Sequence, residues 1–169
     1  GDAIIGVASN GIHSNGFALA RKIILSKYKV TDELPWGQTV AEELLRPTRI
    51  YVRHFKAMKE AGIDVRGIAH ITGSGFKKIL RLGAFKYKVD KLMEMPYIFP
   101  LMQKMGNVEW KEMFTTFNNG VGLVIVVPQK EKQQTLEVLR AHDIAWEMGI
   151  VEASEDPSVE IIPYGVNVS

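Results

Sequence analysis

The sequence contains no cysteine among its 169 residues, which excludes disulfide frameworks, thiol nucleophiles and thiolate metal sites. It also has no apolar run long enough to cross a bilayer. Neither sign of charge dominates, because 21 Lys and Arg side chains against 19 Asp and Glu leave a net charge of +2. So small a charge is untypical of a general nucleic-acid or membrane binder. These absences favour a cytosolic protein that binds small molecules or other proteins.

Known metal and nucleotide motifs are also missing. The histidines are His13, His54, His70 and His142. None of them forms an H-E-x-x-H or similar pattern, so no metal site is predicted. Gly6 to Gly11 has the glycine spacing of a phosphate loop, but Ile12 and His13 stand where Lys and Ser or Thr belong. No G-x-G-x-x-G follows the first apolar run, so a dinucleotide-binding fold is not supported either.

What the sequence does contain is 46% hydrophobic and 24% charged residues, which is typical of one ordinary globular domain. Apolar runs and helical periodicity alternate along the chain. Strands are predicted at residues 3–8, 65–72, 84–90, 121–128, 144–154 and 159–165, and helices at 16–28, 40–45, 50–62, 76–82, 96–106 and 131–142. Because the two kinds of element mix without strict alternation, we predict an α+β or layered α/β fold rather than a sandwich or a bundle.

The segment SNGIHSNG, residues 9–16, lies between the first strand and the first helix. A glycine-rich turn there collects backbone N–H groups at the positive end of the helix dipole, as an anion site requires. The side chains that could add hydrogen bonds to a phosphate are those of Ser9, Asn10, Ser14 and Asn15. His13 could add positive charge. The alternative is a plain turn in which Ser14 or Asn15 caps the helix, and the local chemistry leaves both interpretations open.

Two further loops carry groups of chemical interest. HITGSG, residues 70–75, could present His70 as an acid or base beside backbone donors, or it could be a strand-end histidine and a tight turn. FNNGVG, residues 117–122, is by itself a turn that leads into a strand. Arg49, Lys77 and Lys78 are available cations, although such charges are usually solvated.

Five segments, taken in order, resemble one enzyme family. They are GDAIIGVASNGIHSNGFALARKI, ELLRPTRIYV, GIAHITGSGF, GNVEWKEMFTTFNNGVGLVIVV and GIVEAS. Together they span residues 1–154 and resemble the C-terminal half of aminoimidazole ribonucleotide synthetase, also called phosphoribosylformylglycinamidine cyclo-ligase. The chain is therefore identified as a member of this family, whose relatives include a thiamine-monophosphate kinase and a hydrogenase maturation factor.

The resemblance implies an enzyme of purine biosynthesis that uses ATP and Mg²⁺ to convert formylglycinamidine ribonucleotide to aminoimidazole ribonucleotide. In this family the magnesium ligands and most ATP contacts belong to an N-terminal domain, and the full-length enzyme is expected to be a homodimer. Residues 1–169 are expected to form a single C-terminal substrate-binding domain. Its expected fold is a layered α/β/α domain that partly resembles a ferredoxin-like arrangement. Because the first residue is Gly1 rather than Met, we expect a piece of a longer chain that does not catalyse ring closure alone.

The resemblance also suggests residue roles. It places His70 near the reacting centre as the catalytic residue. The predicted substrate-binding residues are Ser9, Asn10, Gly11, His13, Ser14, Asn15, Gly16, Thr72, Gly73, Gly75, Asn118 and Gly120. Three features depart from the family pattern: Ser74 replaces a glycine, residues 77–82 lack the asparagine that the family carries in the following helix, and Asn119 replaces a methionine expected at a packed position.

A different class of function stays open. The chain could be a non-catalytic nucleotide-binding or interaction domain, or the equivalent domain of a related ATP-dependent enzyme of the same superfamily. An upstream, in-frame domain with Asp-rich magnesium motifs would favour the enzyme. A genuine start at this Gly-Asp would favour the binding domain.

Overall fold

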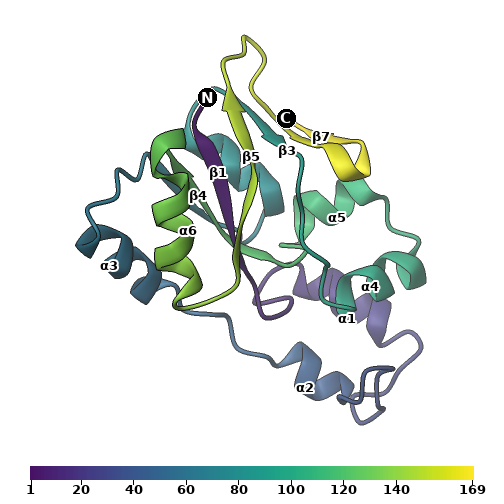
Figure 1. Cartoon of the computed structure of the whole chain (residues 1–169). Helices are drawn as coiled ribbons and strands as arrows, with labels where there is room; N and C mark the ends of the chain where they lie inside the picture. The colour runs from purple at the N-terminus through teal and green to yellow at the C-terminus, as the bar shows by residue number, and fades with distance from the viewer.

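A seven-stranded sheet forms the centre of the computed structural model, which describes residues 1–169 (Figure 1). The strands are β1 (Ala3–Ala8), β2 (Gly67–His70), β3 (Lys86–Val89), β4 (Val121–Val127), β5 (Ala145–Glu152), β6 (Ser158–Ile161) and β7 (Val166–Val168). Their order across the sheet is β2-β4-β1-β5-β3-β6-β7. Neighbouring strands are antiparallel, except that β3 and β6 run parallel.

Helices cover both faces of this sheet. They are α1 (Phe17–Ile24), α2 (Val40–Leu44), α3 (Val52–Glu60), α4 (Ile98–Gly106), α5 (Trp110–Thr116) and α6 (Lys132–Arg140), with 3₁₀ helices η1 (Gly75–Leu82), η2 (Gln129–Glu131) and η3 (Ile162–Tyr164). In Figure 1, α3 and α6 lie on one side of the sheet and α1, α4 and α5 on the other. None of these helices has both the length and the apolar character that a membrane crossing needs.

The alternation of side chains along β4 shows why two helical layers are needed. All of its residues are buried, and successive side chains point to opposite faces. Val124 and Val126 join a hydrophobic cluster that includes Phe99 of α4 and Phe114 of α5. Ile125 lies in the cluster on the opposite face, with Met58 of α3 and Leu136 of α6. A strand buried on both faces needs cover on both, so the predicted layered α/β/α fold is confirmed.

Several predicted elements differ in detail from those of the structure. The helix expected at residues 76–82 is the 3₁₀ helix η1, in which Phe76, Ile79 and Leu82 fall three residues apart and so share one side. The sequence patterns did not predict α5 or β7. The helix predicted over residues 96–106 is confirmed as α4, Ile98–Gly106. The helix tolerates Pro100 because this residue lies in its first turn, where a missing N–H costs no helical hydrogen bond.

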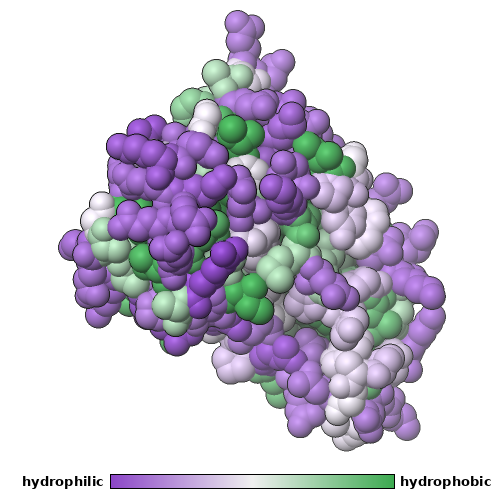
Figure 2. Space-filling view, in the orientation of Figure 1, coloured by the Kyte–Doolittle hydropathy of each residue, from purple (hydrophilic) through white to green (hydrophobic).

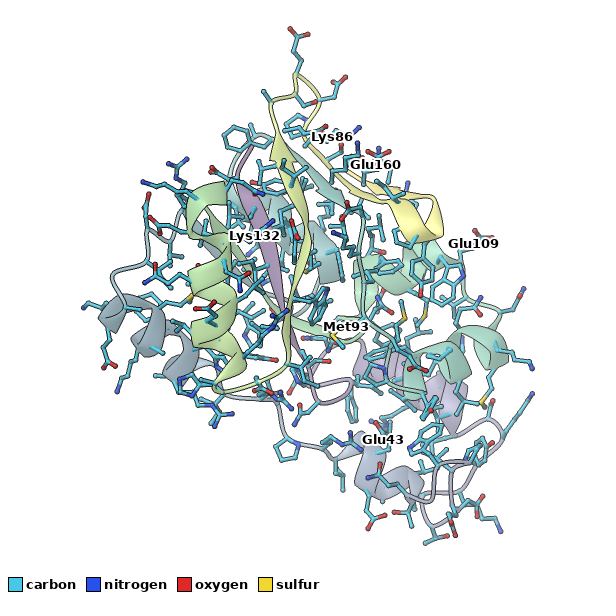
Figure 3. All side chains as sticks on the ribbon, in the orientation of Figure 1. Glu43, Lys86, Met93, Glu109, Lys132 and Glu160 are labelled. Atoms are coloured by element: carbon cyan, nitrogen blue, oxygen red, sulfur yellow. The ribbon has the colours of Figure 1, made fainter.

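The outside of the domain is mostly hydrophilic in the view of Figure 2. Ion pairs across neighbouring strands contribute to this surface, and Figure 3 shows Lys86 of β3 beside Glu160 of β6, with Nζ 2.8 Å from Oε2. Such exposed pairs contribute little to stability, typically about 0–1 kcal/mol. The fold therefore depends on its two apolar clusters rather than on these charges.

Strand direction decides where the loops lie. β4 runs antiparallel to both β1 and β2, and its first residues pair with the last ones of those strands: Val121 with Ala8, and Leu123 with His70. The loop after β1, the loop after β2 and the turn before β4 therefore meet at one edge of the sheet. These are the three segments that the sequence analysis singled out.

Candidate functional site at one edge of the sheet

Asn118 holds the loop after β1 from within. Its side-chain amide nitrogen donates to the carbonyl oxygens of Gly11 at 2.9 Å and Ile12 at 3.2 Å. Its Oδ1 accepts from the Ser9 hydroxyl at 2.9 Å and from the backbone N–H of Gly120 at 2.9 Å. The side chain is fully buried, so it uses its hydrogen-bonding capacity within the protein and shapes the loop.

The hydrogen bonds of the Asn118 side chain, called the clamp here, leave the backbone N–H groups of the loop after β1 free. In a planar trans peptide the C=O of one residue and the N–H of the next point in opposite directions. Because the carbonyls of Gly11 and Ile12 face Asn118, the N–H groups of Ile12 and His13 point away from it. The N–H groups of residues 11–17 donate to no atom of the protein. They lead into the N-terminus of α1, where the helix dipole favours an anion.

Helix α1 has no side-chain cap. Its N-cap residue is Gly16, with φ 63°, and neither Ser14 nor Asn15 accepts from the first turn. The interpretation of these two residues as helix caps is therefore wrong. A Cβ at Gly16 would lie 2.4 Å from the Phe117 ring, so a side chain there would displace the packed aromatic.

Asn15 joins the first loop to the second. Its side-chain amide donates to the carbonyl oxygen of Ile71 at 3.4 Å, and Asn15 itself is buried. Beyond Ile71, the N–H groups of residues 72–74 also donate to no atom of the protein. Gly75 closes the turn with φ 49°, and a Cβ there would meet the carbonyl oxygen of Phe114 at 2.2 Å. The two glycine loops therefore present two groups of free backbone donors side by side.

His13 lies inside the first loop. Its Nε2 is 2.7 Å from Asn10 Oδ1, whereas its Nδ1 is buried without a hydrogen-bond partner. Burial, with smaller contributions from the charges of His70 and Arg49, lowers the pKa of His13 to about 4. The ring is therefore neutral near pH 7, and the expectation that His13 supplies positive charge is wrong.

His70 ends β2 with an exposed side chain. Its ring centroid lies 6.3 Å from that of His13 and 5.5 Å from that of Tyr51. Partial removal of the ring from water, and then the charge of the nearby Lys78, lower the pKa of His70, so its neutral form is favoured. His70 lines a hollow of about 540 Å³ together with Arg49 and Tyr51. The other lining residues are mostly apolar: Thr48, Ile50, Val52, Phe55, Ile68 and Leu123.

The segment that links α2 to α3, residues 46–51, passes below the loops and is called the strap here (Figure 1). Asn10 donates its side-chain N–H to the carbonyl oxygen of Pro47 at 3.1 Å, and Arg46 donates to that of Asn10 at 2.8 Å. The hydroxyls of Ser14 and Thr48 lie 3.1 Å apart at the surface. At its end, Tyr51 donates its hydroxyl to the carbonyl oxygen of Ala8 at 2.8 Å. The strap therefore fixes the loop from outside, as Asn118 fixes it from inside.

The structure brings the substrate-binding residues predicted from the sequence to one edge of the sheet, but it buries some of them and exposes others. Ser9, Asn15 and Asn118 are buried and bonded to the loops, whereas Ser14 and Gly73 are exposed. Asn119, at the position expected to be packed, is buried and donates to the carbonyl oxygen of Met113 at 2.9 Å. The sequence analysis missed the strap as part of the site, although its RPTR segment was noted as a source of cations.

No group of three or more His, Asp or Glu side chains in the chain is arranged to hold a metal ion. The hollow beside His70 and a second one of about 340 Å³ beside Ser14 and Thr48 have no acidic residue in their linings. The linings of these two hollows thus combine hydroxyls, neutral imidazoles and arginine side chains without a carboxylate, whereas the Glu43 carboxylate near Gly11 pairs with Arg46 at 2.8 Å. Such an arrangement favours an anionic, oxygen-rich ligand.

Solved structures share this fold. E. coli HypE, a hydrogenase maturation protein, superposes with a TM-score of 0.59 at 14% identity over 100% of this chain and 48% of that one. A hydrogenase maturation protein HypE in complex with ATP gives a TM-score of 0.65 at 14% identity, over 100% of this chain and 50% of that one. The fold is therefore a layered α/β/α domain of the kind that makes up about half the length of each of these proteins.

Sequence comparison then gives the family. The model of the AIR synthase related protein, C-terminal domain, matches residues 1–162, and the chain belongs to this family. A Methanopyrus kandleri protein named phosphoribosylformylglycinamidine cyclo-ligase is 48% identical over 153 residues, which are 90% of this chain and 44% of that protein. A Thermococcus kodakarensis protein of the same name is 41% identical, over 99% of this chain and 48% of the relative. The chain spans about half the length of the curated relatives that it matches.

Proposed function

We propose that residues 1–169 are the C-terminal, substrate-binding domain of a phosphoribosylformylglycinamidine cyclo-ligase. The observation that carries this proposal is the 48% identity to a protein of that name over 90% of the chain. The complete enzyme would convert formylglycinamidine ribonucleotide to aminoimidazole ribonucleotide with ATP. We further propose that the complete enzyme acts in the cytosol and is a homodimer.

The loops at the sheet edge would bind the ribonucleotide. The free N–H groups of residues 11–17, at the N-terminus of α1, suit its phosphate. Ser14 and Thr48 present exposed hydroxyls next to them. Ser9, Asn15 and Asn118 would act on the ligand through the shape of the loops, because their side chains are buried and bonded to the protein.

His70 would take part in proton transfer. Closure of the imidazole ring would form a carbon–nitrogen bond at the formyl carbon, whose oxygen would leave as phosphate after phosphorylation by ATP, and the attacking nitrogen would lose a proton. The lowered pKa of His70 keeps its ring neutral near pH 7 and able to accept that proton. Thr72 and Gly73 follow on the same loop, and their free N–H groups would orient the substrate beside the ring.

ATP and Mg²⁺ would be bound mainly by the part of the enzyme that this chain does not cover. The residues present do not fit a magnesium site, because no group of three acidic or histidine side chains is arranged to hold a metal ion. We therefore assign to this chain the binding and orientation of the ribonucleotide, and we expect the chain alone to be inactive.

A chimera tests the proposal. In it, this chain replaces the matching half of the Methanopyrus kandleri relative, with the unaltered relative and the 169-residue chain alone as controls. We expect the chimera to close the imidazole ring in the presence of ATP, and the chain alone to show no turnover. A chimera that folds and binds ATP but forms no product would favour a non-catalytic binding domain instead.

A further inference from the structure

A carboxylate behind the strap contacts three basic side chains. Asp143 lies in the turn between α6 and β5, where its backbone N–H donates to the carbonyl oxygen of Leu139 at 3.0 Å. Its Oδ1 pairs with the Arg49 guanidinium, and its Oδ2 lies 3.4 Å from Arg53 and 3.4 Å from Nε2 of His54. The carboxylate is largely buried and belongs to a fixed turn, so it can hold the side chains around it in place.

The charges in this cluster do not cancel. His54 is fully buried, and burial lowers its pKa, so the ring is neutral near pH 7. Arg49 and Arg53 then carry two positive charges against the single negative charge of Asp143. Arg53 is mostly exposed and its charge is screened by water, whereas Arg49 is three-quarters buried at the strap. The cluster therefore carries a net positive charge, and its more buried cation, Arg49, belongs to the strap.

Arg49 lies between the cluster and the loops. Its backbone N–H faces His13 Nε2 at 3.5 Å, and Arg49 is one of the residues that line the hollow of about 540 Å³ together with His70. Its charge contributes to the low pKa of His13, as expected of a cation near that ring. A guanidinium has five N–H donors, and the only side chain that accepts from Arg49 is Asp143. Donors therefore remain for a ligand in the hollow.

We propose that Arg49 binds an anionic, phosphate-bearing ligand in the hollow beside His70, and that Asp143 is the positioning residue that orients the Arg49 guanidinium. Planar guanidinium groups match phosphate oxygens with paired N–H donors, provided that their orientation is fixed. The proposal deepens the proposed function, on which it rests, by naming a cation at the ribonucleotide site. It concerns binding, so it can be tested without ring closure.

The test separates orientation from charge. Ribose 5-phosphate is titrated into the 169-residue chain, and saturable amide shifts of residues 48–52, 68 and 70, which line the hollow, and of the adjoining loop residues 11–17 are followed by NMR. Arg49→Gln is expected to weaken binding roughly 10-fold or more, as loss of a charge-assisted hydrogen bond does. Arg49→Lys should restore little, because a lysine lacks the planar pair of donors. Asp143→Asn should weaken binding as well, although it makes the net charge more positive by one.

Arg66→Gln is the matched control, because Arg66 pairs with Asp2 away from the loops and its loss removes the same charge. It should leave binding unchanged, and thermal unfolding of each variant shows whether the fold is retained. Three results would overturn the proposal: no saturable shifts with ribose 5-phosphate, an unchanged affinity in folded Arg49→Gln, or tighter binding by Asp143→Asn. Binding that depends on Arg49, together with an inactive chimera, would instead refute the proposed function and leave this proposal intact.

Discussion

The side-chain amide of Asn118 donates to the carbonyl oxygen of Gly11 at 2.9 Å, across 107 positions of the chain. The same side chain binds Ser9, Ile12 and Gly120, so one buried residue fixes the loop after β1 to the turn before β4. Because the clamp turns the loop's carbonyls inward, it also turns backbone donors outward.

Asn118→Ala should destabilise the fold by about 2–4 kcal/mol, because it removes four hydrogen bonds of a fully buried side chain and leaves the Ile12 carbonyl oxygen and the Gly120 N–H without a protein partner. Urea unfolding measures the change. Asn167→Ala, at an exposed position of β7, is the control and should change the free energy of unfolding by less than about 0.5 kcal/mol. Equal, small effects of both substitutions would show that the clamp does not matter for stability.

Two glycines of the second loop should respond differently to alanine. At Gly75 a Cβ would lie 2.2 Å from a backbone oxygen, and φ is 49°, so Gly75→Ala should cost about 2 kcal/mol or more. At Gly73 a Cβ meets no atom within 4 Å, so Gly73→Ala should keep the stability within about 0.5 kcal/mol. Thermal unfolding compares the two, and a Gly75→Ala variant as stable as the parent would contradict the structure of this turn.

Ser14→Ala should separate ligand binding from stability. Because Gly16 is the N-cap of α1, loss of the Ser14 hydroxyl removes no cap, and the free energy of unfolding should change by less than about 0.5 kcal/mol. In the chimera, the Michaelis constant for the ribonucleotide should rise while the unfolding midpoint stays constant. A lower midpoint with normal substrate affinity would remove Ser14 from the binding site. Asn15→Ala, which breaks the contact to Ile71, should lower both affinity and midpoint.

His70→Ala in the chimera should lower kcat by roughly 10²- to 10⁴-fold, the usual contribution of a general acid or base. The side chain is exposed and accepts or donates no hydrogen bond within the protein, so the unfolding midpoint should change little. Kinetics and thermal unfolding of the same preparation give the comparison. A loss of rate that merely follows the loss of folded protein would assign His70 a structural role.

Stability should fall on acidification. Histidines of the unfolded chain titrate near pH 6.5, whereas burial lowers the pKa of His13 to about 4 in the fold. Between these two values the unfolded state binds more protons, so the free energy of unfolding decreases as pH falls, by at most about 1.4 kcal/mol per pH unit for each proton. Urea unfolding from pH 7 to pH 4 measures this slope, and His13→Gln should make it shallower. An identical slope in the variant would show that His13 does not contribute.

The sequence could predict the layers and much of the site. Continuous apolar runs such as residues 121–128 indicated strands, and glycine with asparagine marked the loops. Local patterns failed where tertiary contacts decide the structure: β7 is too short for a clear alternation, and the period of η1 is set by its packing rather than by helix propensity. The ordered motifs, rather than any single loop, indicated the family to which the chain belongs.

The sequence by itself determined most of the segments that form strands, helices and glycine loops, because these depend on local periodicity and backbone freedom. Only the tertiary structure decided which of them meet. Antiparallel pairing of β4 with β1 and β2 brings residues 9–16, 70–75 and 118–120 to one edge, and packing of α6 places Asp143 against Arg49, 94 positions away. Such long-range contacts leave no trace in local spacing. Burial, which no motif specifies, likewise decided that His13 is neutral and that Asn118 shapes the loop from within.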